Sequence, residues 1–159
     1  MEYKNYRKYD DVSNCIGYVA HMHDSTNFDI DISLPPIYKK RYSQVITANY
    51  YFSYLPETDF IYGHDPSKIV KQCSTAYRCR LRGVGACKNG NRQLQNEIMS
   101  AVAKLIHSTD MYVCLCVSDI DVYQRLLVDI RCAEVNLRDF ILAMDPQGLC
   151  FYKYDISRR

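Results

Sequence analysis

Three arginines alternate with other residues in the segment 77–88, and this spacing suggests phosphate binding. Arg78, Arg80 and Arg82 would share one face of an extended strand, because side chains of a strand alternate between its two faces. Guanidinium groups spaced in this way repel one another, so such a face is either hydrated or holds an anion, and the planar arginine fork suits phosphate oxygens. Two nearby glycines end the strand and would allow the backbone to approach a ligand closely. The segment therefore predicts either a solvated edge strand or a phosphate-facing strand.

Pairs of cysteine and histidine suggest a second kind of chemistry, metal binding. Cys114 and Cys116 would share one face of a strand, and His21 and His23 would do the same. Thiolate and imidazole groups make tetrahedral zinc sites, so the two pairs would form one if the fold brought them together. Cysteines inside an apolar run are also common core residues, and the chain has no Cys-x-x-Cys motif. The sequence therefore leaves zinc as an alternative to buried thiols.

A thiol nucleophile is a third candidate, at Cys87. The neighbouring Lys88 would stabilise a thiolate, but the sequence places no histidine beside it, and a nucleophile needs a positioned base. Four aspartates also fall in pairs, on a strand or in a turn: Asp29 with Asp31, and Asp119 with Asp121. We interpret the first pair as the solvated face of a half-buried strand. A displaced metal site built from Asp24 and one of these aspartates is the alternative.

Hydrophobic periodicity indicates the elements that would position these groups. Apolar or alternating runs predict five strands, of which the first two form a hairpin, and a final apolar segment. They cover residues 15–20, 28–34, 77–82, 111–117, 122–130 and 149–154. Apolar stripes at helical spacing predict helices over residues 93–107 and 136–144. Residues 35–76 form a long irregular excursion that is β-prone at 42–54.

The composition limits the class of protein. A chain of 159 residues with 48% hydrophobic residues is large enough for one globular domain. Its net charge of +2 produces no global field for nucleic acid, so any such binding must come from a local patch. Residues 1–11 lack the apolar segment of a signal peptide, and no apolar run is long enough to span a membrane. We therefore expect the eight cysteines to be reduced thiols in an intracellular compartment, the cytoplasm or nucleus, or in a virion if the protein is viral.

Four segments, in their order and spacing, resemble the staphylococcal nuclease (thermonuclease-like) family. Residues 24–32 are similar to its Asp-Gly-Asp-Thr motif and the alternating strand that follows, and residues 77–88 to its Phe-Arg-Leu-Leu-Leu-Val-Asp-Thr-Pro-Glu stretch. Residues 121–130 are similar to its Asp-Lys-Tyr-Gly-Arg-Gly-Leu-Ala-Tyr-Ile segment. Residues 135–149 are similar to its helix that begins Val-Asn-Glu-Ala-Leu-Val and is followed by Gly-Leu.

This resemblance implies a mainly β fold with helices (α+β), namely a five-stranded OB-like barrel with two packed helices and a long insertion. The domain would span residues 15–154, with the insertion at about 35–76. A polar N-terminal arm, residues 1–14, would precede it, and a tail, residues 155–159, would follow.

In that family two arginines hold the scissile phosphate, and their positions match Arg80 and Arg125. Two aspartates bind Ca²⁺ and a glutamate activates water, and here the corresponding positions do not match. They fall on Thr26 (or Ser25 if the register slips), Gly85 and Lys88, and Cys87 stands in place of a proline. Only Asp24, the first aspartate of the motif, is kept.

These departures change the chemistry that the resemblance implies. Calcium needs several hard oxygen ligands, with carboxylates supplying most of the negative charge. A lysine in place of the glutamate would instead repel the cation. We therefore predict that the Ca²⁺ site is lost, that no cofactor is bound, and that Asp24 is at most a weak metal ligand. Without metal and general base, the arginines would hold a phosphate but hardly activate water.

The sequence thus predicts a non-enzymatic module on a nuclease-like scaffold, in one of two versions. In the first, a basic pocket binds nucleic-acid phosphates, as grooves of OB-type barrels often do. Its residues would be Arg80, Lys88 and Arg125, with Arg78 and Arg82 beside them.

In the second version, the tyrosine-rich arm and insertion dock the domain into a protein assembly, as in a minor structural protein of a large DNA virus. The tyrosines expected to contact partners are Tyr42, Tyr50, Tyr51 and Tyr54. A metal-dependent phosphodiesterase with rearranged ligands is the alternative to both versions.

Overall fold

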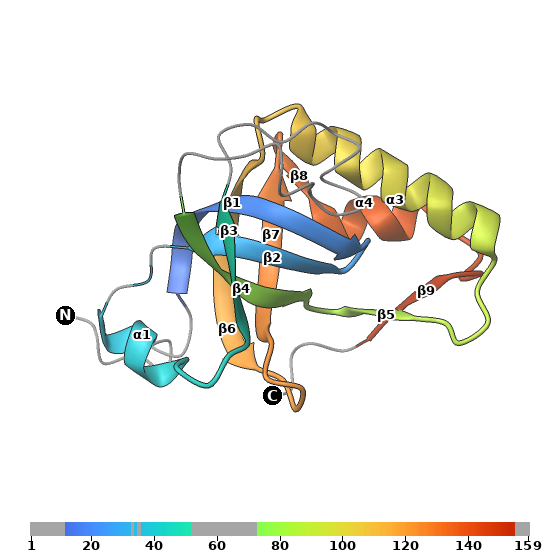
Figure 1. Ribbon diagram of the computed structural model, residues 1–159. Coiled ribbons are helices and arrows are strands. Elements are labelled where there is room, and N and C mark those ends of the chain that lie inside the picture. Colours follow the sequence, from blue (N-terminus) through green and yellow to red (C-terminus); the bar gives the residue numbers. More distant parts are fainter. Residues whose placement is uncertain (1–11, 33, 35, 52–72, 155–159) are drawn as a thin grey trace.

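The computed structural model describes residues 12–32, 34, 36–51 and 73–154 of the chain (Figure 1). The described elements follow one another in the order β1 (Val12–Asp24), β2 (Asn27–Ile32), α1 (Pro36–Arg41), β3 (Thr47–Tyr51), β4 (Cys73–Leu81), β5 (Val84–Ala86), α3 (Arg92–His107), β6 (Tyr112–Ile120), β7 (Leu126–Cys132), β8 (Val135–Asn136), α4 (Leu137–Met144) and β9 (Phe151–Lys153). No helix in these ranges is long and apolar enough to cross a membrane.

Five of the strands form a closed mixed barrel. Neighbouring strands run in the order β4-β2-β1-β6-β7, and β4 pairs with β7 to close the ring. That closing pair is parallel, with Cys79 opposite Leu126, whereas the other four pairs are antiparallel. The barrel is mainly β with helices and OB-like, which confirms the fold class expected from the sequence.

Alternating side chains fill the interior of the barrel. Phe28, Ile30 and Ile32 are all less than 5% exposed, as the period-two pattern of β2 predicts. The inward residues of β6 and β7 join them in one core with Leu81 from β4. Because Leu81 points inward, its neighbours Arg80 and Arg82 must point outward, away from the core.

Helices α3 and α4 lie along one side of the barrel, whereas α1 lies apart from them (Figure 1). The side chain of Asn91 caps α3 by accepting a hydrogen bond from the backbone N–H of Leu94, and Asn136 caps α4 in the same way. The apolar stripe of α3 buries Ile98, Val102 and Ile106, as its helical spacing predicts. Beside the helices, β5 and β9 form a separate two-stranded ribbon that extends β4 outward.

Several boundaries differ from the sequence-based expectation. The excursion at 35–76 contains α1 and the edge strand β3, and its residues 52–72 lie outside the described residues. β1 begins at Val12, so the last residues of the expected 1–14 arm belong to a strand; residues 1–11 and the tail 155–159 are not described. β7 begins at Leu126 rather than at Val122, because the intervening residues form a tight turn.

Candidate functional site

A pocket of about 550 Å³ opens between the barrel, the start of α3 and the β5–β9 ribbon. The turn between β1 and β2 contributes Asp24, Ser25, Thr26 and Asn27, and Arg80 and Arg125 enter from β4 and from the turn before β7. The opposite walls come from α3 (Gln95, Asn96, Met99) and from β5 and β9 with the residue beyond (Gly85, Ala86, Phe151, Tyr152, Tyr154). The volume falls within the usual range of small-molecule sites.

Arg80 brings a positive charge that is not balanced by an ion pair. Its Nη2 donates a hydrogen bond to the carbonyl oxygen of Val84 at 2.8 Å, and no carboxylate contacts it among the described residues. Its Nη1 is buried and has no hydrogen-bond partner within the described ranges. Burial lowers the pKa of this guanidinium, and the charge of Arg125 lowers it further, whereas Tyr154 and Asp24 act in the opposite direction. An arginine remains charged at neutral pH even so, and a buried cation with an unused donor is suited to an anionic ligand.

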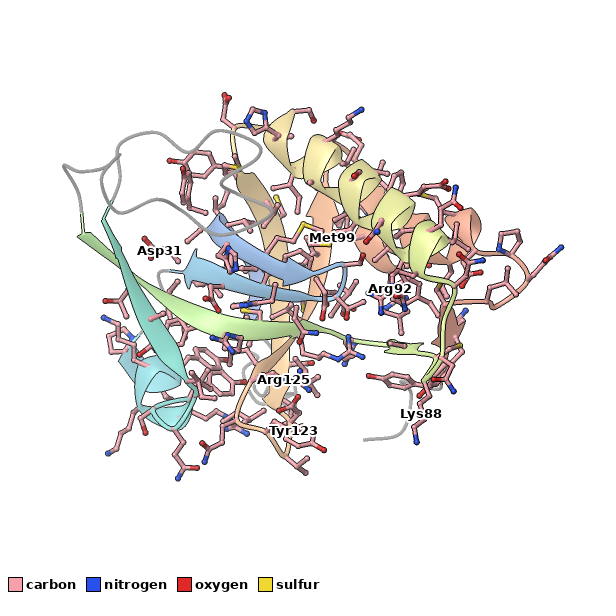
Figure 2. All side chains as sticks on the ribbon, turned by 45° about the vertical axis from the view of Figure 1, so that its right-hand side comes forward. Asp31, Lys88, Arg92, Met99, Tyr123 and Arg125 are labelled. Atoms are coloured by element: carbon pink, nitrogen blue, oxygen red, sulfur yellow. The ribbon has the colours of Figure 1, made fainter. Side chains whose placement is uncertain are left out.

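Arg125 is held rigidly at the neighbouring wall. Its Nε and Nη2 each lie 2.7 Å from Oδ2 of Asp121, and its Nη1 donates to Oδ1 of Asn27 at 2.7 Å. Oδ1 of Asp121 accepts the backbone N–H groups of Tyr123 and Arg125, which fixes the tight turn before β7. The guanidinium also lies over the ring of Tyr123 at 5.2 Å (Figure 2). Asp121 offsets the charge of Arg125, so Arg80 contributes more of the pocket's free positive charge.

Among the residues that the structure describes, Asp24 is the only carboxylate that lines the pocket. Its Oδ1 accepts hydrogen bonds from the backbone N–H and the hydroxyl of Thr26, at 2.9 and 3.1 Å, and both its oxygens accept from the amide of Asn27. These bonds hold the turn between β1 and β2. The carboxylate is therefore already part of a local hydrogen-bond network.

The remaining walls are aromatic and amide-bearing. Tyr152 is 51% exposed and covers Gly85 so closely that a Cβ atom there would lie 2.4 Å from the tyrosine Cζ. The loop before β9 is fixed by Asp145, whose carboxylate accepts the three backbone N–H groups of residues 149–151 at 2.7–2.8 Å. Burial of this carboxylate raises its pKa, but the three hydrogen bonds outweigh burial and leave the pKa lowered. The wall that carries Tyr152 is therefore well anchored.

The structure does not bring all five predicted basic residues together. Arg78 pairs with Asp29 at 2.5 Å, and Arg82 pairs with Asp129 at 3.0 Å. Lys88 is exposed in the loop after β5 and does not line the pocket; Figure 2 shows it well apart from Arg125. Separate carboxylates neutralise two of the three outward arginines, Arg78 and Arg82, and reduce the repulsion along the strand. Only Arg80 and Arg125 meet at the pocket.

The burial of Asp29 shows that one sequence-based interpretation was wrong. It was expected on a solvated sheet face, but it is 1% exposed. Its Oδ1 binds Arg78 and its Oδ2 lies 2.9 Å from Nε2 of His23. A buried carboxylate requires such partners, and the registers of β1, β2 and β4 place them beside it.

Of the four tyrosines expected to contact partners, the structure describes the side chain of Tyr42 alone. Tyr42 is 1% exposed in the core, with its ring stacked on Tyr38 at 6.3 Å. The side chains of Tyr50 and Tyr51, and all of Tyr54, lie outside the described residues. The clearly exposed tyrosines in the described ranges are Tyr112, Tyr123, Tyr152 and Tyr154, and the last two line the pocket.

The candidate zinc ligands do not meet. β1 and β6 pair, but Ile16 lies opposite Cys114, and His21 lies five residues further along β1, roughly 16 Å away. In the part of the chain that the structure describes, no three His, Cys, Asp or Glu side chains gather in a way that would hold a metal ion. Cys87 is half-buried, and its thiol donates a hydrogen bond to the carbonyl oxygen of Gly148, which is not a base.

The residues at the expected calcium positions do not fit that ion. Gly85 has no side chain to offer and lies beneath Tyr152, and the hydroxyl of Thr26 donates to Asp24. Lys88 lies outside the pocket. One carboxylate beside two arginines provides too little negative charge for a calcium ion. The pocket as built favours an anion.

Several pocket residues were not predicted as site residues. Gln95, Asn96 and Met99 were assigned only to the helix over residues 93–107, and Tyr152 only to a short apolar segment. Their contribution depends on how α3 and β9 pack beside the barrel. Comparisons of the chain with protein-family models, with curated proteins and with solved structures find no match, so the site is interpreted from its own residues.

Proposed function

We propose that the protein is a divergent nuclease-like module that binds single-stranded nucleic acid through this pocket and does not hydrolyse it. The observation that carries the proposal is the state of Arg80: a half-buried cation beside Arg125, with a buried N–H group that has no partner in the described part of the chain. Leaving a buried donor unpaired costs about 1–3 kcal/mol. A phosphate oxygen would pair with that donor and balance the charge.

The other walls suit a nucleotide better than a free phosphate. Exposed rings of Tyr152 and Tyr154 offer faces on which an unpaired base can stack. The side-chain amides of Gln95 and Asn96 each supply donors and an acceptor for the edge of a base. Bases in a duplex are not available to such walls, which supports a single-stranded ligand.

The same residues argue against hydrolysis. Cleavage of a phosphodiester needs an activated water, which a metal ion or a general base normally provides. Within the described ranges, Asp24 is the one carboxylate on the pocket wall, and it accepts hydrogen bonds from Thr26 and Asn27. The two arginines can hold the phosphate but cannot accept a proton from water.

The test is a titration of a fluorescent single-stranded DNA and RNA octamer, followed by anisotropy over a series of salt concentrations. Arg80→Gln and Arg125→Gln should each weaken binding about tenfold or more and lower the salt slope by about one. The matched control is Arg131→Gln, an exposed arginine on β7 away from this pocket, which should change neither value. Affinity that ignores salt, or that survives both pocket substitutions, would rule out the proposal. The same samples are incubated with Ca²⁺, Mg²⁺, Mn²⁺ or chelator, and metal-dependent cleavage would refute the non-hydrolytic part.

A further inference from the structure

Two cysteines face each other at the end of the β5–β9 ribbon, beside the pocket. The ladder pairs Val84 with Lys153, Gly85 with Tyr152 and Ala86 with Phe151, so the next opposed pair is Cys87 and Cys150. The backbone N–H of Cys87 donates to the carbonyl oxygen of Cys150 at 2.7 Å, which continues the ladder by one step. Both thiols are reduced in the structure.

This arrangement matches the requirements of a disulfide. Directly opposed residues of an antiparallel pair have Cα atoms about 4.5–5.5 Å apart and side chains on the same face. Disulfides need Cα separations of roughly 4.4–6.8 Å. Each thiol is held only by one weak hydrogen bond, Cys87 to the carbonyl of Gly148 at 3.5 Å and Cys150 to the carbonyl of Asn91 at 3.2 Å. Rotation of the two side chains toward each other would therefore break little.

The strand ladders place the other described cysteines opposite residues of other types, and Cys116 lies opposite Asp129. Cys15 lies opposite Leu115, and Cys114 lies opposite Arg131. Cys79 and Cys132 are buried and face Leu126 and Val135 in their ladders. Within the described ranges, the end of the β5–β9 ribbon is the only place where the strand ladders put two cysteines directly opposite each other.

The two thiols differ in solvent exposure, and this difference indicates which of them reacts first with an oxidant. Cys87 is half-buried and can be reached by a small oxidant, whereas Cys150 is fully buried. Burial raises the pKa of the Cys150 thiol, and the neighbouring Cys87 raises it further. Cys87 would therefore react first, and Cys150 would resolve the product.

We propose that Cys87 and Cys150 form a reversible disulfide that fastens the ribbon wall of the pocket. With a peroxide as oxidant, the Cys87 sulfur attacks one peroxide oxygen, the O–O bond breaks, and a sulfenic acid and one water form. The Cys150 sulfur then attacks the sulfenic sulfur, the S–O bond breaks, and a second water leaves as the S–S bond forms. Together the thiols lose two electrons and two protons, which the peroxide takes up. A dithiol reductant reverses the change by thiol–disulfide exchange.

The bond would act on both stability and the pocket. It would close a loop of roughly 60 residues that contains both packed helices, which corresponds to a rise in Tm of about 10 °C for a domain of this size. It would also hold Gly85 and Tyr152 in register, and both line the pocket. The inference does not depend on the identity of the pocket's ligand.

The test treats the full chain with a small excess of hydrogen peroxide, blocks free thiols, and maps crosslinked peptides by mass spectrometry without reduction. The expected result is one crosslink between the peptides of Cys87 and Cys150, a loss of two titratable thiols, and a higher Tm that dithiothreitol reverses. Cys87→Ser should abolish all three effects, and Cys114→Ser, an exposed cysteine elsewhere, should abolish none. Cys150→Ala provides a second variant, which should convert Cys87 into a sulfenic acid that a dimedone probe labels.

The proposal is overturned by a dominant crosslink that involves another cysteine, or by oxidation of Cys87 to sulfinic acid without a crosslink in the unsubstituted chain. An oxidised chain with the expected crosslink but an unchanged Tm would overturn its stabilising role. Oligonucleotide binding is measured separately on both forms. If neither form binds, the proposed function fails while the disulfide stands.

Discussion

The free energy of unfolding of an Arg80→Met protein shows whether Arg80 serves a ligand or stabilises the fold. Methionine is unbranched and uncharged, so it keeps an apolar stem in place of the arginine stem and removes the guanidinium with its donors. Removal of the unpaired buried Nη1 should gain about 1–3 kcal/mol, and loss of the charged hydrogen bond to the carbonyl of Val84 should cost about 1.5–3 kcal/mol. The two effects nearly cancel. We expect the free energy of unfolding to stay within about 1 kcal/mol of that of the unsubstituted protein.

Arg78, two residues earlier on the same strand, is the matched control. Its Nε binds Asp29, which is 1% exposed and also pairs with His23. Arg78→Met would leave a buried carboxylate poorly balanced, and breaking buried pairs costs about 3–5 kcal/mol. Because the Arg78 side chain is 29% exposed, we expect a loss of about 2–4 kcal/mol. At the midpoints of these ranges, the effects of the same substitution at the two sites should thus differ by about 3 kcal/mol.

Urea unfolding at several temperatures measures both variants, with the m-value checked for constancy. Oligonucleotide should raise the unfolding midpoint of the Arg78→Met protein and not that of the Arg80→Met protein. If Arg80→Met destabilises the protein as much as Arg78→Met does, the Arg80 guanidinium is a structural group. In that case the argument from its unpaired donor to a phosphate ligand is wrong.

Three further substitutions and one control test other parts of the structure. Asp145→Asn should lower the free energy of unfolding by about 2–3 kcal/mol, because an amide replaces a carboxylate that accepts three backbone N–H groups. The pKa of Asp145 is lowered from 3.8, so this stabilisation is complete above that value and is lost as pH falls through the lower folded pKa; the stabilities of the two proteins should therefore begin to converge only as pH falls below 3.8. Gly85→Ala should displace the ring of Tyr152 and weaken oligonucleotide binding severalfold in the anisotropy assay, with little change in Tm because the ring is exposed. Asn91→Ala should cost about 1 kcal/mol in urea unfolding by removing the cap of α3. Lys88→Gln should leave affinity and salt slope unchanged, because Lys88 does not line the pocket.

The barrel strands could be predicted because each one carries its own signal. Phe28, Ile30 and Ile32 alternate with polar residues, and the structure buries all three. The short strand β5 offers no such signal, since Val84–Ala86 has no period and pairs with β9 more than sixty residues away. The predicted start of β7 was too early for a different reason. Residues 122–125 are β-prone in part, but the Asp121 carboxylate binds two of their backbone N–H groups and stabilises a turn instead.

The candidate site was predictable only in part, for the same physical reason. Arg80 and Arg125 were singled out from the sequence, and the parallel pairing of β4 with β7 places them on neighbouring walls of one pocket. Arg78 and Arg82 look equivalent to Arg80 in the sequence. Their neutralisation depends on Asp29 and Asp129, which lie on other strands and are brought close by the barrel register. The local sequence pattern identifies a charged side chain. Which residue pairs with it depends on the strand register of the closed barrel.

The balance of charge in the pocket decides between holding a phosphodiester and cutting it. Asp121 is committed to Arg125 through its Oδ2 and to the backbone through its Oδ1, so it is not available to a metal ion or to water. In the described part of the chain that leaves Asp24 as the one carboxylate on the pocket wall beside Arg80, and one carboxylate beside a guanidinium without an ion pair attracts an anion more strongly than a divalent cation. A metal-dependent nuclease would need a pocket that attracts a divalent cation more strongly than an anion. Arg125→Gln should release Asp121 and raise the affinity of the pocket for Mn²⁺, measured by quenching of tyrosine fluorescence, above that of the unsubstituted protein. Tight Mn²⁺ binding by the unsubstituted chain, lost in Asp24→Asn, would show that the carboxylates already cooperate and that the pocket is built for a cation.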